Sequence, residues 1–234
     1  MRVAVLETGA PPADLAERFG DYPDMFERLL EMGPLARFQV SHGHWPEAVG
    51  AFDAYVITGS PAGVYDPLPW IADLKTFLRA AKGQAALVGI CFGHQVMAEA
   101  FGGHVIKSPK GWGVGLQHYQ VIDPQPWMDH APGFSIPASH QDQVILHPPE
   151  AKVVAANPLT HIAALTYRDQ PALSFQGHPE FEVDFAQALL KSRKGSALPH
   201  DQAEAAIASL NHPNDRGRVG GWIRAFLQGV SSAG

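Results

Sequence analysis

The feature that most constrains the fold of this chain is an apolar segment, residues 85–91, that ends at its only cysteine. The segment reads AALVGIC and continues as Phe92-Gly93. A strand that is apolar on both faces belongs in a parallel sheet covered on two sides. Glycines two positions before and two after a nucleophile let a strand turn tightly into a helix and leave the nucleophile exposed at the turn. We therefore expect a buried parallel strand followed by a nucleophile elbow at Cys91.

The rest of the first half alternates short apolar runs with helical ones. Apolar residues at 71, 74, 77 and 78, for example, have the spacing of an amphipathic helix. Strands alternating with helices predict an α/β fold with a mostly parallel central sheet covered on two sides. The expected strands are 3–8, 37–41, 54–58 and 85–91, and the expected helices are 15–32 (broken at Tyr22-Pro23), 71–81 and 94–101.

The middle of the chain has a different sequence pattern. Residues 104–168 contain short β-rich runs between proline and glycine clusters, which predicts an antiparallel β elaboration of the sheet. A core strand is expected at 172–176 and helices at 181–191, 202–210 and 217–227, the last with an apolar stripe that packs on the domain. The basic run Lys191–Lys194 is interpreted as a solvated helix end. We expect one domain over residues 1–234, with a core of about 1–190 and a C-terminal helical extension of about 191–234.

Composition narrows the class of partner. The chain has 234 residues, is 46% hydrophobic and 17% charged, and carries a net charge of −6. That mild acidity argues against nucleic acid or an anionic membrane as the main partner. No window approaches the ~20 apolar residues of a membrane span. One cysteine cannot form an internal disulfide, so a cytoplasmic protein is expected.

A thiol nucleophile needs a base, and one histidine stands in a suitable context. Ser174-Phe175-Gln176-Gly177-His178-Pro179-Glu180 is a core-like strand that ends in a polar triplet. Proline keeps the preceding residue extended, so His178 and Glu180 are expected to project to the same side. A carboxylate beside an imidazole fixes its tautomer and stabilises the imidazolium. The alternative is that Glu180 only lies in the first turn of a helix, and both can hold. Strands ending at one sheet edge can bring Cys91 and His178 together.

These motifs together resemble the class I glutamine amidotransferases. Gly89-Ile-Cys-Phe-Gly-His-Gln95, followed about 85 residues later by Gly177-His-Pro-Glu180, is similar to the motifs of that family, and the resemblance covers roughly residues 50–185. It includes Ile57-Thr-Gly-Ser-Pro61, which matches the family's glycine-rich oxyanion segment. It also includes Ser139-His-Gln-Asp142, which is similar to a segment near the glutamine pocket of GMP synthetase glutaminase domains.

The resemblance implies a flavodoxin-like, three-layer fold and roles for individual residues. Cys91 would be the nucleophile, His178 the general base and Glu180 its orienting partner. The backbone N–H groups of Gly59 and Phe92 would stabilise the oxyanion, a role that the first amides of a helix after Cys91 can also fill on physical grounds. Ser60, Gln95, Ser139 and His140 would contact the substrate. No metal or organic cofactor is implied, and the histidine pair His42 and His44 lacks a third ligand at a suitable spacing.

The expected activity is hydrolysis of the γ-amide of glutamine through a cysteine thioester. Only residues 181–234 follow Glu180, so a synthetase that receives ammonia would be a separate subunit. The motifs also resemble stand-alone members, including plant γ-glutamyl peptidases, so cleavage of γ-glutamyl peptides is the first alternative. A non-catalytic module of the same fold is the second, which the complete triad disfavours, and a nucleotide- or flavin-binding protein is disfavoured because the first strand lacks a phosphate loop. Trp112, in the glycine-rich loop 107–115, is expected at the rim of the pocket.

Overall fold

The apolar run before Cys91 forms a central strand of the sheet in the computed structural model, which describes residues 1–233. The strands are β1 (Val3–Leu6), β2 (Ala36–Phe38), β3 (Ala54–Ile57), β4 (Ala86–Ile90), β5 (His104–Lys107), β6 (Gly113–Val121), β7 (Gly133–His140), β8 (Asp142–Leu146), β9 (Ala151–Ala156), β10 (Ala164–Tyr167) and β11 (Ala172–Phe175). The helices are α1 (Ala13–Phe19), α2 (Tyr22–Leu30), α3 (Pro69–Ala81), α4 (Phe92–Ala100), α5 (Val183–Arg193), α6 (His200–Ser209) and α7 (Arg216–Ala233).

Nine of these strands form one sheet in the order β2-β1-β3-β4-β11-β10-β9-β6-β7. The first five strands in that order are parallel, and the remaining four pair antiparallel. Strands β5 and β8 form a separate antiparallel pair. The mostly parallel α/β fold with an antiparallel elaboration, expected from the sequence, is confirmed. Within the sheet β4 lies between β3 and β11, with Gly89 opposite Ile57 and Ser174.

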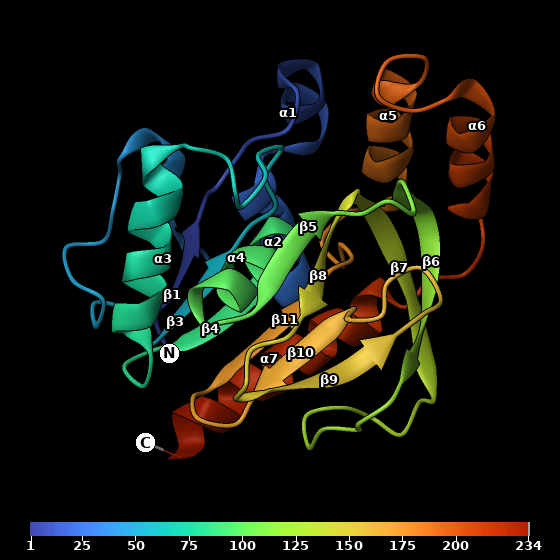
Figure 1. Cartoon of the computed structure of the whole chain (residues 1–234). Coiled ribbons are helices and arrows are strands. Elements are labelled where there is room, and N and C mark those ends of the chain that lie inside the picture. The colour runs from blue at the N-terminus through green and yellow to red at the C-terminus, as the bar shows by residue number, and fades with distance from the viewer. Residues whose placement is uncertain (234) are drawn as a thin grey trace.

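Helices cover both faces of the parallel part (Figure 1). Alternate residues of β1 point to opposite faces, and Val5 packs with Phe26 of α2 and Ile223 of α7. The adjacent Leu6 packs on the other face with Leu74 of α3 and other residues of α3 and α4. The apolar stripe of α7 therefore completes one of the three layers, as its spacing predicted.

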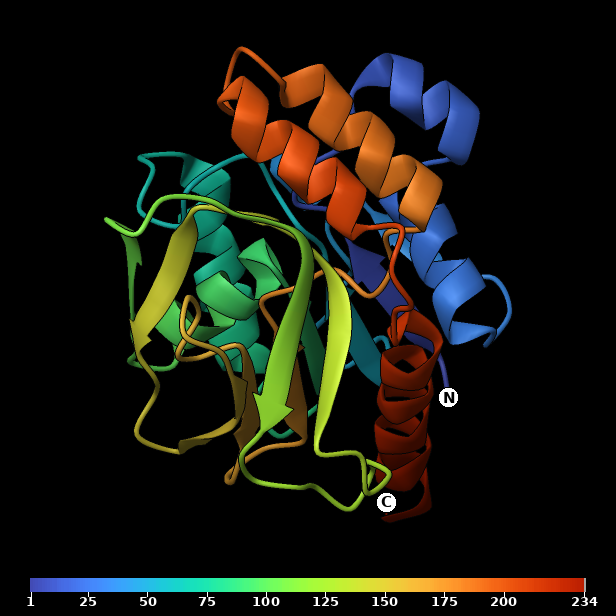
Figure 2. The same cartoon turned by 90° about the vertical axis from the view of Figure 1, so that its right-hand side faces the viewer.

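A third apolar cluster lies beyond the carboxyl ends of the parallel strands. Figure 2 shows α5 and α6 side by side next to α1. Phe181 and Phe185 pack there with Leu15 of α1, Met25 of α2 and Val114 of β6. This cluster places the C-terminal end of α5 above the edge of the sheet at which Cys91 lies.

Several boundaries differ from the expected ones for local reasons. The break between α1 and α2 falls before Tyr22, because Asp21 caps α2 and exchanges hydrogen bonds with Asp24. The strand expected at 37–41 ends at Phe38, and a 3₁₀ turn follows at Val40–His42. None of the helices in residues 1–233 has the length and apolar character needed to cross a membrane.

Candidate active site

The elbow at Cys91 has the strained geometry that its sequence predicts. Cys91 has φ +54° and ψ −102°, a backbone conformation that residues other than glycine rarely adopt. It separates β4 from α4, and its N–H donates to the carbonyl of Phe175 at 2.8 Å. A Cβ on Gly93 would lie 2.3 Å from the carbonyl oxygen of Ile57. Strain held in place by such close backbone packing is typical of functional sites.

His178 reaches this elbow from the segment after β11. Its backbone N–H donates to the carbonyl of Pro137 in β7 at 2.7 Å, and its ring stacks on Phe181 with centroids 3.9 Å apart. Its Nδ1 donates to Oε1 of Glu180 at 2.7 Å, and both side chains are at most 5% exposed. The structure therefore brings Cys91, His178 and Glu180 together as the resemblance implied.

The charges around His178 favour its protonated form. Burial alone would lower its pKa, but the Cys91 sulfur, which it contacts, and the Glu180 carboxylate outweigh burial and raise the pKa to about 10. Arg216 holds the turn in place by donating to the carbonyls of Pro179 and Glu180 at 2.9 and 3.1 Å. The imidazole is thus protonated at neutral pH and can act first as a proton donor.

Gly59 and Phe92, the residues expected to stabilise an oxyanion, both lie beside Cys91. Gly59 follows β3, and a Cβ there would lie 3.0 Å from Cε1 of His178 and 3.8 Å from Cβ of Cys91. Thr8 donates its hydroxyl to the Gly59 carbonyl at 3.0 Å, which fixes this peptide. Phe92 is the first residue of α4, directly after the nucleophile. A side chain at residue 59 would therefore make a tight contact with the ring of His178.

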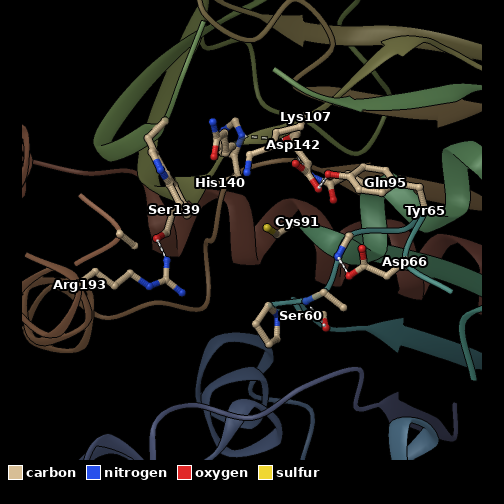
Figure 3. A pocket seen from close by; sticks show the side chains of 16 residues that line it. Ser60, Tyr65, Asp66, Cys91, Gln95, Lys107, Ser139, His140, Asp142 and Arg193 are labelled. Atoms are coloured by element: carbon tan, nitrogen blue, oxygen red, sulfur yellow. Dashed lines mark hydrogen bonds between the residues drawn. The ribbon is translucent and has the colours of Figure 1, made fainter. Parts of the chain in front are cut away.

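A cavity of about 560 Å³ opens beside Cys91. Figure 3 shows the sulfur at its centre, with Ser139 and Arg193 on one side and Tyr65 and Asp66 on the other. The four residues expected to contact substrate all line it: Ser60, Gln95, Ser139 and His140. The loop after β5 contributes Trp112, as expected for a residue of the pocket rim.

The wall beyond Gln95 is held by a hydrogen-bond network. The Gln95 amide donates to the carbonyl of Asp142 at 2.8 Å and to Oε1 of Gln176 at 3.2 Å. Gln176 in turn reaches the Cys91 sulfur at 3.8 Å. The hydroxyl of Tyr65 donates to the Asp142 carboxylate at 2.9 Å. This side of the cavity is therefore rigid and carries both acidic groups and amides.

His140 and His94 are both buried and differ in where they point. His140 lines the cavity, has no hydrogen-bond partner at Nε2 among residues 1–233, and has its pKa lowered to about 4, first by burial and then by the charge of His178. His94 lies under the elbow, with Nδ1 2.8 Å from the Ser174 hydroxyl, and burial lowers its pKa to about 3. Both rings are neutral at pH 7. His94 does not line the cavity, whereas His140 forms part of its wall and has its unpaired Nε2 buried next to Gly113.

Sequence reasoning missed Tyr65, Asp66 and Arg193 as cavity residues, whereas Lys107 belongs to the loop 107–115 that was expected near the pocket rim. The interpretation of Lys191–Lys194 as a solvated helix end is wrong for Arg193, whose side chain lines the cavity and donates to Ser139 at 2.6 Å.

Helical spacing could have identified Arg193, since it follows the buried Phe185 and Leu189 at intervals of four residues. No comparable sequence signal marks Tyr65 or Asp66, which lie in a loop. Within residues 1–233, no three histidine, cysteine or acidic side chains gather as metal ligands.

Comparison with known proteins places this geometry in a family. The family model described as glutamine amidotransferase class-I matches residues 35–192. Gamma-glutamyl peptidase 4 of Arabidopsis thaliana is 29% identical, over 88% of this chain and 87% of its own. One of the subunits of the glutamine-hydrolysing GMP synthase of Ignicoccus hospitalis is 34% identical, over 70% of this chain and 85% of its own.

Solved structures agree on the fold. A glutamine amidotransferase from Thermotoga maritima superposes with a TM-score of 0.75 at 15% identity, covering 98% of this chain and 97% of that one. The family match spans more than half of the residues and includes the elbow. The chain belongs to the class I glutamine amidotransferase family.

Proposed function

We propose that this protein hydrolyses a γ-linked glutamyl amide through a thioester on Cys91. The observation that carries this proposal is the strained Cys91, in contact with a buried His178–Glu180 pair and open to a cavity of about 560 Å³. An unactivated amide requires a strong nucleophile, an oxyanion site and a proton for the departing nitrogen. This chain can supply all three from its own side chains and backbone.

In the acylation step the Cys91 sulfur attacks the γ-carbonyl carbon of the substrate. The C–S bond forms while the carbonyl π electrons move to oxygen, where the N–H groups of Gly59 and Phe92 stabilise the negative charge. The C–N bond then breaks as the oxyanion collapses, and protonated His178 gives its proton to the leaving nitrogen. Ammonia or an amine departs and the γ-glutamyl thioester remains.

In the deacylation step His178 acts as the base. The sulfur is neutral in the thioester, so one of the two causes that raise the pKa of His178 is gone. The less basic imidazole takes a proton from water as the water attacks the thioester carbonyl. The C–S bond breaks and glutamate is released, while the proton taken from water stays on His178, so that Cys91 and His178 return to their state before acylation.

The cavity wall on the Gln95 side fits the amino-acid end of such a substrate. Asp66 and Asp142 provide carboxylates for an α-ammonium group, and Lys107 provides a cation for an α-carboxylate. Tyr65 fixes the Asp142 carboxylate by a hydrogen bond of 2.9 Å. A γ-glutamyl group held there presents its γ-carbonyl to Cys91.

On family membership and the triad alone, glutamine is the first candidate substrate. The γ-glutamyl peptides are the second candidate. The likeness to the Arabidopsis gamma-glutamyl peptidase over 88% of this chain favours them, as does a cavity that continues past Cys91 to Arg193. The likeness to the Ignicoccus GMP synthase polypeptide supports a further possibility, delivery of ammonia to a separate synthetase subunit.

The proposal is tested by trapping and by turnover. Because Cys91 is the only cysteine, a diazoketone analogue of glutamine should alkylate one residue, identified by mass spectrometry of the peptide that contains it. Glutamate release from glutamine and from γ-glutamylglycine should be measurable in the isolated chain. The variant Cys91→Ala serves as the blank and should lose both adduct and release.

Two outcomes would contradict the proposal. An adduct at another residue would remove Cys91 from its assigned role. Release of glutamate that persists in Cys91→Ala would likewise assign the reaction to another group. The absence of release from either substrate would instead favour a non-catalytic module or dependence on a partner. Restoration of glutamine hydrolysis on addition of a candidate synthetase would separate these two.

A further inference from the structure

Arg193 is a cation in the cavity that has no carboxylate partner among residues 1–233. Its interactions there are a hydrogen bond of 2.6 Å to the Ser139 hydroxyl and a cation–π contact with Trp112, whose ring centroid is 5.8 Å from the guanidinium carbon. A guanidinium has five donors in a planar fork that matches a carboxylate. Two neutral contacts leave part of that fork facing the cavity. The other cavity cation, Lys107, lies close to Asp142 in Figure 3 and shares the acidic side.

The position of Arg193 is fixed by its backbone. Three N–H groups of the turn after α5, those of residues 196–198, donate to the Arg193 carbonyl at 3.0–3.2 Å. Side chains on a helix lean toward its N-terminus, and α5 begins just after Phe181, the residue on which His178 stacks. The Arg193 side chain is directed into the cavity, where it donates to the Ser139 hydroxyl at 2.6 Å.

Arg193 lies on the side of Cys91 from which the amine departs. His178 protonates the leaving nitrogen, so the leaving group must lie toward His178. The His178 N–H is bonded to Pro137 of β7, and Ser139, two residues further on the same strand, is bonded to Arg193. Figure 3 shows Gln95, Tyr65 and Asp66 on the opposite side of the sulfur. The amino-acid end of the glutamyl group and the leaving group thus extend in opposite directions.

We infer that Arg193 binds a carboxylate on the leaving group, so that the preferred substrates are γ-glutamyl amino acids or peptides with a free carboxylate. This inference rests on the proposed function and names its substrate class. Free glutamine uses the acidic wall and Lys107 but leaves Arg193 unpaired. A γ-glutamyl amino acid adds one negative charge at the position of the unpaired cation, with Trp112 and Ser139 holding the fork.

Two substrates that differ only in that charge test the inference. γ-Glutamylglycine and γ-glutamylglycinamide have the same scissile bond, and only the first has a carboxylate on its leaving group. We expect kcat/KM for the acid to exceed that for the amide at least tenfold, which corresponds to about 1.4 kcal/mol. In Arg193→Gln this ratio should fall to between one and two, and Arg193→Lys should restore part of it. Lys191→Gln removes an exposed charge from the same helix outside the cavity and should keep the wild-type ratio.

Binding to Cys91→Ala separates this inference from the proposed function. Calorimetry on that variant should show γ-glutamylglycine binding at least tenfold more tightly than the amide, and the difference should vanish in Cys91→Ala/Arg193→Gln. Equal affinity for the two ligands, or a preference that survives loss of Arg193, would overturn the inference even if Cys91-dependent hydrolysis is found. A preference in binding without any hydrolysis would support it while refuting the proposed reaction.

Discussion

The pair His178–Glu180 offers the most direct test of the proposed chemistry, through Glu180→Gln. Oε1 of Glu180 accepts the hydrogen bond from His178, whereas Oε2 has no hydrogen-bond partner in residues 1–233. A glutamine can therefore keep its oxygen toward His178 and place its NH₂ group at the Oε2 position. The substitution thus removes the charge while it preserves the shape and the acceptor.

The expected size of the effect follows from the charge alone. Two unit charges about 4 Å apart interact by roughly 4 kcal/mol at an effective dielectric constant of about 20, which corresponds to at most about three pH units for the pKa of His178. Glu180 is one of the two groups that raise this pKa above its ordinary value. His178 should therefore lose its proton at lower pH in the variant. The imidazolium should also no longer be stabilised by a carboxylate in the transition state. We expect kcat to fall by about 10²–10⁴ with little change in substrate affinity.

The assay is the pH dependence of kcat/KM for whichever substrate is turned over. In the wild type the alkaline limb should lie near pH 10, because protonated His178 is needed for the leaving nitrogen and is lost as the pH rises through its pKa. In Glu180→Gln this limb should move to lower pH. Glu182→Gln is a matched control, since its half-exposed carboxylate pairs with Arg28. Wild-type kcat together with an unmoved limb in Glu180→Gln would reduce Glu180 to a structural residue of the turn.

Two further predictions concern stability. Gly93→Ala should destabilise the protein by about 3 kcal/mol or more in urea unfolding, because its Cβ would lie 2.3 Å from the backbone carbonyl of Ile57 in the sheet. Gly217→Ala is the control, since a Cβ there meets no atom within 4 Å. Equal stability of the two variants would refute this reasoning. His94 and His140 have folded-state pKa values of about 3 and 4, below the ordinary 6.5. As the pH falls below 6.5, these histidines therefore bind protons in the unfolded state but not in the folded state, and the protein loses stability. The loss is up to about 2.7 kcal/mol per pH unit for the two together. Urea midpoints that do not fall between pH 6.5 and pH 5 would contradict it.

The parts of the site that could be predicted from the sequence are those determined by short-range patterns. The elbow depends on Gly89, Cys91 and Gly93, whose spacing is itself the structural requirement. The approach of His178 to Cys91 follows from topology, because two buried strands that end in polar residues, β4 and β11, are parallel neighbours. The role of each residue remains a proposal, but their proximity is a direct result of the sheet.

The remainder of the cavity could not be predicted because it depends on how distant segments pack. Tyr65 lies in a loop, and its hydroxyl donates a hydrogen bond to Asp142, which is distant in the sequence. The position of Asp142 depends in turn on the separate pairing of β5 with β8. Residues 191–194 include three basic residues, and this composition alone indicates a solvated helix end. Only the apolar cluster that buries one face of α5 turns Arg193 inward and leaves Lys191 exposed.

Helix α5 links the proposed chemistry to the proposed specificity. Phe181, just before the helix, supports the ring of His178, and Arg193 at its other end faces the cavity. Helical geometry fixes the separation between the two ends, so the residue that supports His178 and the backbone of Arg193 keep a constant spacing. A leaving group that pairs with Arg193 is thereby held with its nitrogen near His178, so the same contact that selects the substrate also orients the bond to be broken. Free glutamine lacks this contact, so under the proposed binding mode we expect it to be hydrolysed more slowly than a γ-glutamyl amino acid.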